Sequence, residues 1–191
     1  MENQPDFEIH ANGPISKEFL KRNILTFKHA CLFIKKLAYG RNRDKTNLVS
    51  LFNDNCGTCS TKHALLKKLA EENNFDQLKL FVGLFKMNKT NYPEVAKTLS
   101  ENNLEFVPEA HCYLKWEDQI LDLTKINSDP KDFLNDLLEE IEILPNQITE
   151  YKVNFHKNYL NIWLKNNPQI NLSLNSIWKI REQCIQDLTC N

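Results

Sequence analysis

The chain has 191 residues, 41% of them hydrophobic, which is enough for one domain with its own core. Lys and Arg number 24 against 25 Asp and Glu, so no overall basic field favours a nucleic acid or a membrane surface as partner. The N-terminal residues do not resemble a secretory signal, and no segment approaches the ~20 apolar residues of a membrane span. We therefore expect a cytoplasmic protein, and the abundance of Asn, Lys and Ile is typical of an A/T-rich bacterial genome.

Six cysteines, at positions 31, 56, 59, 112, 184 and 190, are spread too thinly to form a disulfide framework. A zinc site usually needs two close pairs of Cys or His ligands. Cys56 and Cys59 make one pair, but His111 and Cys112 would point to opposite sides of a strand. The sequence therefore predicts no metal site and implies no organic cofactor.

The first part of the chain predicts two helices with a cysteine loop between them. Residues 1–13 are polar and expected to be irregular. From Ser16, apolar residues recur every third or fourth position as far as Gly40, which predicts one long amphipathic helix. After a basic loop and the run "LVSLF", residues 60–73 predict a half-buried helix. Its outward residues are expected to be Lys62, Lys67, Lys68, Glu71 and Glu72.

The second part predicts a mixed sheet followed by helices. Residues 78–87 read as a buried strand, 92–103 as a short helix, and 109–116 with 119–124 as a hairpin. Everything after Pro130 is predicted to be helical, in segments 131–144, 146–167 and 174–188, the last capped by Ser173 or Asn171. The fold class is therefore α+β. We expect a single domain, 1–191, with a core at 17–126 and a helical extension at 127–191 packed on it.

The predicted hairpin brings a histidine and an aspartate together. Successive strand residues alternate between faces, so His111 and Tyr113 share one face. With a turn at 117–118, Trp116 pairs with Gln119 and Tyr113 with Asp122. Asp122 is then a diagonal neighbour of His111 on the same face, roughly 7–8 Å away at the backbone.

A histidine held by a carboxylate can activate a cysteine at the start of a helix. Cys59 has this position, where the positive end of the helix dipole lowers the pKa of a thiol. His111 would exchange the proton and Asp122 would orient the ring. Backbone amides at the helix start could form an oxyanion hole. The residues considered for it are Asn55, Gly57 and Thr58.

Four stretches carry a family resemblance: "FIKKLAYGRN", "CGTCSTKHALLKKLAEE", "KLFVGLF" and "EAHCYLKWEDQILDLT". Together they resemble the transglutaminase-like core of the papain-type cysteine fold, over about residues 24–125. The resemblance implies that Cys59 is the nucleophile, His111 the base and acid, and Asp122 the orienting carboxylate. It also implies acyl transfer or hydrolysis of an amide, in a peptide or small molecule, through a thioester.

Two other functions remain open. The segment Cys56-Gly57-Thr58-Cys59 before a helix also fits a thioredoxin-like oxidoreductase, in which Cys56 attacks and Val107-Pro108 stands for the cis-proline loop. A catalytically inactive binding module of the same fold is the third possibility. His63, one turn after Cys59, is a rival base, but no acid is in view to orient it, and we expect it on the exposed helix surface.

Overall fold

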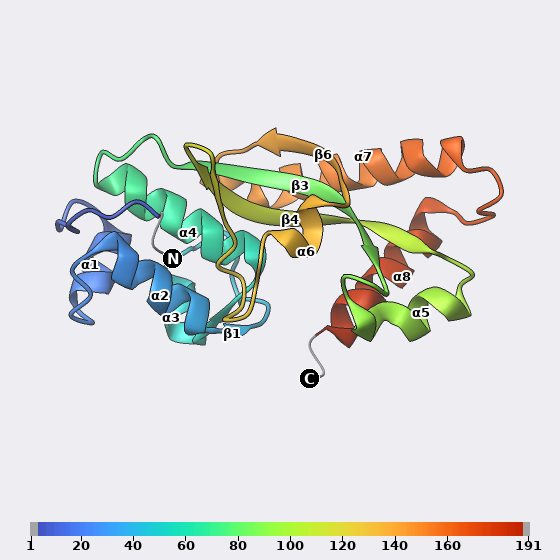
Figure 1. Ribbon diagram of the computed structural model, residues 1–191. Helices are drawn as coiled ribbons and strands as arrows, with labels where there is room; N and C mark the ends of the chain where they lie inside the picture. The colour runs from blue at the N-terminus through green and yellow to red at the C-terminus, as the bar shows by residue number, and fades with distance from the viewer. Residues whose placement is uncertain (1–3, 189–191) are drawn as a thin grey trace. The chain divides into compact units, whose positions relative to one another are not determined.

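The structure is a computed structural model that describes residues 4–188, and its mixture of helices with an antiparallel hairpin confirms the α+β class (Figure 1). The elements of the first half are α1 Pro14–Leu20, α2 Phe27–Lys36, β1 Ala38–Tyr39, α3 Ser50–Asp54, β2 Cys56–Gly57, α4 Cys59–Glu72 and β3 Lys79–Asn88. Those of the second half are η1 Pro93–Val95, α5 Ala96–Glu101, β4 Phe106–Trp116, β5 Gln119–Leu121, α6 Lys131–Leu134, β6 Leu137–Glu142, η2 Pro145–Ile148, α7 Glu150–Asn166 and α8 Leu174–Asp187.

The chain forms two compact units, and it passes between them several times. The first unit contains the described part of Met1–Val82 together with Cys112–Pro130 and Ile141–Thr149. The second contains Gly83–His111, Lys131–Glu140 and the described part of Glu150–Asn191. The expected boundary between residues 126 and 127 therefore does not coincide with a boundary between the units.

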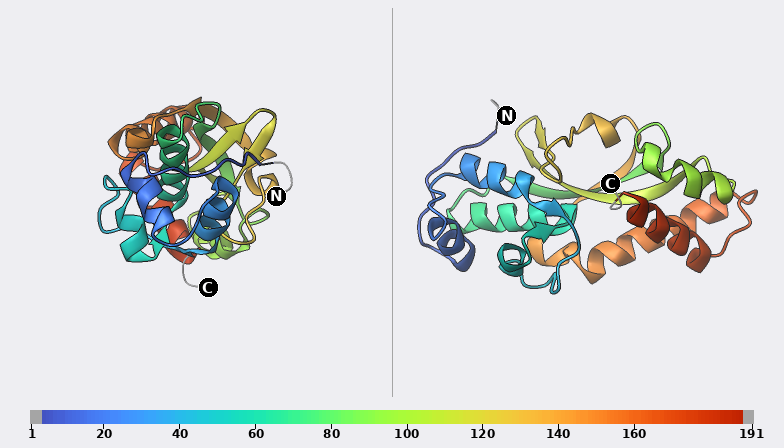
Figure 2. Two further views of the ribbon diagram at one scale, coloured as in Figure 1. Left: turned by 90° about the vertical axis from the view of Figure 1, so that its left-hand side faces the viewer. Right: turned by 90° about the horizontal axis from the view of Figure 1, so that it is seen from below.

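In the first unit, other elements surround α4. Helices α1 and α2 and the turn η2 all contact it, and the first two lie beside it in Figures 1 and 2. The short strands β1 and β2 pair in parallel, with Ala38 opposite Cys56 and Tyr39 opposite Gly57. This pairing fixes the cysteine loop directly before α4.

The predicted long helix from Ser16 to Gly40 is wrong, because the chain breaks it into α1 and α2. Asn23 takes a left-handed conformation with φ of 57°, and the Ile24 N–H donates back to the Phe19 carbonyl. Thr26 then starts α2 by accepting a hydrogen bond from the His29 N–H. Asn is among the few residues that tolerate this conformation, and Thr is a favoured N-cap, so local backbone chemistry overrides the continuous apolar periodicity.

The main sheet has the strand order β5-β4-β3-β6. The register predicted for the hairpin is confirmed, since Trp116 lies opposite Gln119 and Leu114 opposite Leu121. The turn contains no glycine, but Glu117 supplies the left-handed residue with φ of 51°. Strand β5 ends at Leu121, so Asp122 lies just beyond the strand.

The helix predicted for residues 131–144 is largely wrong. Only α6 is helical there, and β6 follows it as an edge strand of the main sheet. The segment "LLEEIE" suits either a helix or a strand by its pattern, and pairing with the sheet decides the outcome. Within the first unit, for example, the Ile143 N–H donates to the Leu80 carbonyl just after β6.

In the second unit, α7 and α8 pack together, as the right-hand view of Figure 2 shows. Both helices have their predicted positions, and Ser173 caps α8 by accepting from the Ser176 N–H. Arg181 of α8 forms a two-pronged ion pair with the buried Glu109 of β4. His156 of α7 is also buried, and its Nε2 lies 2.8 Å from the Pro108 carbonyl.

Candidate active site

Cys59 is the first residue of α4, and a capping box holds the helix start. The Thr61 N–H donates to the Thr58 hydroxyl, while the Thr58 N–H donates to the Thr61 hydroxyl at 3.0 Å. The Cys59 side chain is buried, and its Sγ lies 3.9 Å from the Ser60 hydroxyl. A cysteine in this position is close to the positive end of a fourteen-residue helix, which favours its thiolate.

Gly57 has to be glycine because its neighbours leave no room for a side chain. A Cβ there would lie 2.8 Å from Leu51 Cδ1 and 2.9 Å from Lys62 Cγ. Its carbonyl accepts a hydrogen bond from the Gly40 N–H at 3.3 Å, which secures the parallel pair β1–β2. The structure thus gives Gly57 a packing role beneath the helix start.

The other residues considered for an oxyanion hole have different surroundings. The Thr58 amide is already engaged by the Thr61 hydroxyl within the capping box. Asn55 is exposed and ends α3 in a left-handed conformation with φ of 52°. Cys56 is half-buried, and its Sγ lies 3.9 Å from the Arg41 carbonyl.

His63 is fully buried, contrary to the prediction that it lies on the helix surface. Its Nε2 accepts a hydrogen bond from the Leu123 N–H at 2.8 Å, and its Nδ1 lies 2.7 Å from the Cys59 carbonyl. Because Nε2 accepts, the ring proton sits on Nδ1 and donates to that carbonyl. Backbone groups therefore engage both nitrogens of a neutral ring, which leaves His63 unsuited to deprotonate Cys59.

Lys62 also contradicts its predicted outward position. The side chain is fully buried, and Nζ donates to the carbonyls of Leu37 and Thr124, each at 2.6 Å. Burial lowers the pKa of Lys62 to about 8, opposed by the negative charge that Cys56, Asp122 and Cys59 carry when ionised. Lys67 is buried too, and it pairs with Glu71 at 3.5 Å.

Asp122 is buried in the first unit beside α4. Its Oδ1 accepts from the Thr124 N–H at 3.0 Å and lies 3.8 Å from His63 Nε2. The expectation that no acid lies near His63 is therefore wrong, since the Asp122 carboxylate is close to one ring nitrogen while the backbone carbonyl of Cys59 meets the other. The sequence interpretation considered His63 as a rival base but expected it to be exposed, and it missed Lys62 as a site neighbour, although a spacing of three from Cys59 places Lys62 next to it on the helix.

The segment that carries the candidate base also touches the start of α4. The thiol of Cys112, which follows His111 in β4, donates to the Ser60 hydroxyl at 3.5 Å. Cys112 is fully buried, which is consistent with a contact between a strand and a helix. The residue after Cys59 and the residue after His111 are thus in contact within the first unit.

His111 itself belongs to the second unit and lies among aromatic rings there. Its ring centroid is 4.9 Å from that of Phe133 in α6 and 6.4 Å from that of Phe85, which it meets edge to face. The side chain is 8% exposed.

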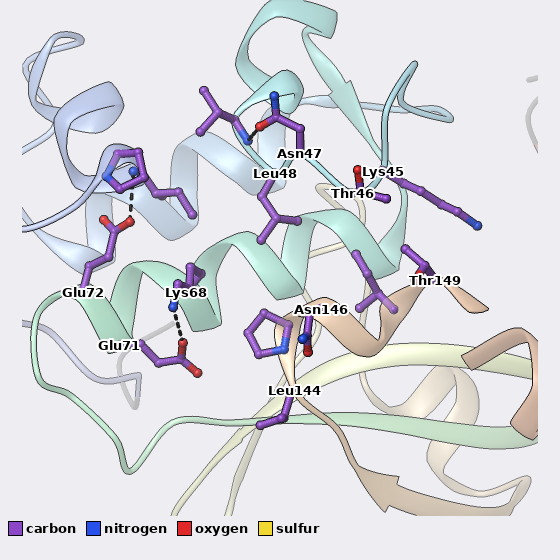
Figure 3. Close-up of a pocket in the computed structure, with 15 residues that line it drawn as sticks. Lys45, Thr46, Asn47, Leu48, Lys68, Glu71, Glu72, Leu144, Asn146 and Thr149 are labelled. Atoms are coloured by element: carbon purple, nitrogen blue, oxygen red, sulfur yellow. Dashed lines mark hydrogen bonds and ion pairs between the residues drawn. The ribbon is translucent and has the colours of Figure 1, made fainter. Parts of the chain in front are cut away.

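A separate cavity of about 530 Å³ lies in the first unit along α4 (Figure 3). Apolar residues such as Ile15, Leu48 and Leu144 line it, and Lys68 pairs with Glu71 at its edge. Glu72 also borders it and accepts from the N–H groups of Ile15 and Ser16. The described lining residues do not include Cys59, His111 or Asp122.

Within residues 4–188, no three His, Cys, Asp or Glu side chains are grouped as they would be to hold a metal ion. Over the same range, none of the helices has the length and apolar character needed to cross a bilayer.

The chain was also compared with known protein families, with curated proteins and with solved structures, and none of them matches it.

Proposed function

We propose that the protein is a transglutaminase-like cysteine enzyme that performs acyl transfer or hydrolysis on an amide of a peptide or small molecule. Cys59 would be the nucleophile, His111 the base and acid, and Asp122 the orienting carboxylate. The position of Cys59 at the capped start of α4, in the unit that also contains Asp122, carries the proposal. The confirmed hairpin register and the burial of Asp122 support it further.

The proposed reaction has two halves that share one intermediate. His111 takes the proton of the Cys59 thiol, the thiolate attacks the amide carbonyl, and the protonated His111 gives that proton to the departing amine, which leaves a thioester. In the second half, water or an amine gives a proton to His111 and attacks the thioester carbonyl. The Cys59 thiolate then leaves, and the acid or the new amide is released.

The surroundings of His63 support the choice of base. His63 is nearer to Cys59 in the sequence, but backbone groups engage both of its ring nitrogens. A general base needs a nitrogen that can reach the proton it removes. His63 therefore does not fit the role of the base, which the proposal assigns to His111.

The thioredoxin-like alternative rests on the same cysteine loop and assigns the attack to Cys56. That residue is the more exposed of the two cysteines, which the alternative requires. However, Cys56 lies in β2, which pairs with β1 in a two-stranded sheet of its own, apart from the four-stranded sheet. This arrangement favours acyl transfer over disulfide exchange, and an inactive binding module remains the third candidate.

Alkylation by iodoacetamide, followed at each cysteine by peptide mass spectrometry from pH 4 to 9, tests the proposal. We expect fast labelling of Cys59 at mildly acidic pH, retained in Cys56→Ser and lost in His111→Asn. Dependence on Cys56 would favour the oxidoreductase. Slow labelling with an ordinary thiol pKa would favour the binding module and contradict the proposed enzyme.

A further inference from the structure

Lys62 is the most unusual charged residue beside the candidate nucleophile. It lies three residues after Cys59 in α4, and its side chain is fully buried. A buried ammonium is costly unless polar partners replace its water. Here the carbonyls of Leu37 and Thr124 do so, each 2.6 Å from Nζ.

These contacts connect three separate segments to the helix start. Leu37 directly precedes β1, and Thr124 follows the end of β5. The aliphatic part of the Lys62 side chain fills the space that a side chain at Gly57 would need, since a Cβ on Gly57 would lie 2.9 Å from Lys62 Cγ. One lysine therefore fixes the cysteine loop, its partner strand and the segment after β5.

Asp122 is held by the same arrangement. Its Oδ1 accepts from the Thr124 N–H, and the Thr124 carbonyl accepts from Lys62. The next helix residue, His63, accepts from the Leu123 N–H. Two adjacent residues of α4 thus bind the segment 122–124 through its backbone.

We propose that Lys62 is a positioning residue, which holds Asp122 and the cysteine loop in register and whose buried positive charge favours the Cys59 thiolate. The inference rests on the proposed function and deepens it. The ionisable groups that interact with the ammonium are Cys56, Cys59, Asp122 and Lys125, so its environment contains three potential anions and one cation.

The charge state of Lys62 fits this role. Burial lowers its pKa, but only to about 8. Lys62 is therefore still an ammonium over the mildly acidic to neutral range in which an activated thiol ionises. A neutral lysine would hold the carbonyls less strongly and would not stabilise a thiolate.

The test uses the full chain with Cys56→Ser and compares Lys62→Met with Lys67→Met. Lys67 is a matched control, since it is also a buried lysine of α4 but lies one turn and a half further along and pairs with Glu71. We expect Lys62→Met to raise the apparent pKa of the Cys59 thiol by about one unit, which makes alkylation at pH 6 about tenfold slower. Lys67→Met should leave the alkylation profile unchanged, and Lys62→Arg should restore most of the original reactivity.

The outcomes separate this inference from the proposed function. A folded Lys62→Met protein with an unchanged profile overturns the positioning role, while the loss of reactivity in His111→Asn still supports the enzyme. An ordinary thiol pKa in the unmodified chain overturns both. If Lys62→Met does not fold, Lys62→Gln replaces it, because its amide can still donate to a carbonyl without a charge. An unchanged profile in that variant would likewise overturn the inference.

Discussion

Two adjacent polar side chains of α4 find their partners in the backbone of distant segments. Lys62 binds the carbonyls of Leu37 and Thr124, and His63 binds the Leu123 N–H. A buried polar group is tolerated when such partners satisfy it, and its loss leaves them unsatisfied as well. These two residues therefore contribute to stability as well as to the geometry beside Cys59.

Replacing His63 with leucine should lower the free energy of unfolding by about 2–3 kcal/mol. The leucine fills similar space but leaves the Leu123 N–H and the Cys59 carbonyl without their hydrogen bonds to the ring. Urea unfolding followed by circular dichroism measures the change. His10→Leu is the control, since His10 is exposed. Equal stability of the His63 variant and the original chain would contradict the assigned hydrogen bonds.

The lowered pKa of Lys62 predicts a dependence of stability on pH. Burial lowers it from 10.5 to about 8, so the unfolded chain binds the proton more tightly between these values. The free energy of unfolding should therefore rise with pH from about 8 to 10.5, on the order of 1–3 kcal/mol from this residue. Below pH 8 both states are protonated and the cost of burying the charge is fully present.

Urea unfolding at pH 7.5 and pH 10 measures that rise, and the difference between the original chain and Lys62→Met isolates it. The rise in the free energy of unfolding should be smaller in Lys62→Met by about 1–3 kcal/mol, and it should be unchanged in Lys67→Met. The same rise in all three proteins would show that Lys62 does not have the lowered pKa.

The start of α4 is the element on which the candidate site depends. A helix leaves its first N–H groups without partners inside the helix, and the capping box of Thr58 and Thr61 satisfies part of this need. Thr58→Ala should lower the free energy of unfolding by about 1 kcal/mol, while Thr58→Ser should retain most of it. Thermal and urea unfolding of both variants check this, and an equal loss in both would contradict the cap.

Several elements could be predicted from the sequence because local chemistry determines them. Strand β3, the hairpin register and helices α4, α7 and α8 agree with their apolar patterns and caps. The break at Asn23 and strand β6 could not be predicted from periodicity. The break depends on the single left-handed residue Asn23, and β6 forms because it pairs with β3, which is far away in the sequence. Of the site, the position of Cys59 at a helix start was predicted, whereas the burial of Lys62 and His63 depends on long-range contacts.

At the scale of the whole molecule, each unit contains a cluster of buried polar residues. In the second unit this cluster includes Glu109 and His156, and it should make the stability of that unit sensitive to acid. Burial raises the pKa of Glu109, but the charge and hydrogen bonds of Arg181 outweigh it, and the net pKa is lowered. Burial lowers the pKa of His156 to about 4. The unfolded chain therefore binds protons more tightly at both groups, and stability is lost as the pH falls, through His156 from 6.5 to about 4 and through Glu109 below 4.5.

Tryptophan fluorescence can follow this loss in the second unit. In a Trp116→Phe background the remaining tryptophans, Trp163 and Trp178, both belong to that unit. Stability from urea unfolding should fall from pH 6.5 to 4.5, and His156→Gln should flatten the fall because its amide does not titrate. His10→Gln is the control, and a fall of equal slope in both variants would contradict the role of His156.

The central claim is that the Cys59 thiol, the His111 ring and the Asp122 carboxylate converge in that order. The distance from Cys59 Sγ to the nearer ring nitrogen of His111, measured in a crystal structure, tests it most directly. We predict about 3–4 Å, as in a nucleophile paired with its base, with Asp122 within hydrogen-bond reach of the other nitrogen. A His111 ring with both nitrogens directed away from that sulfur would contradict the account.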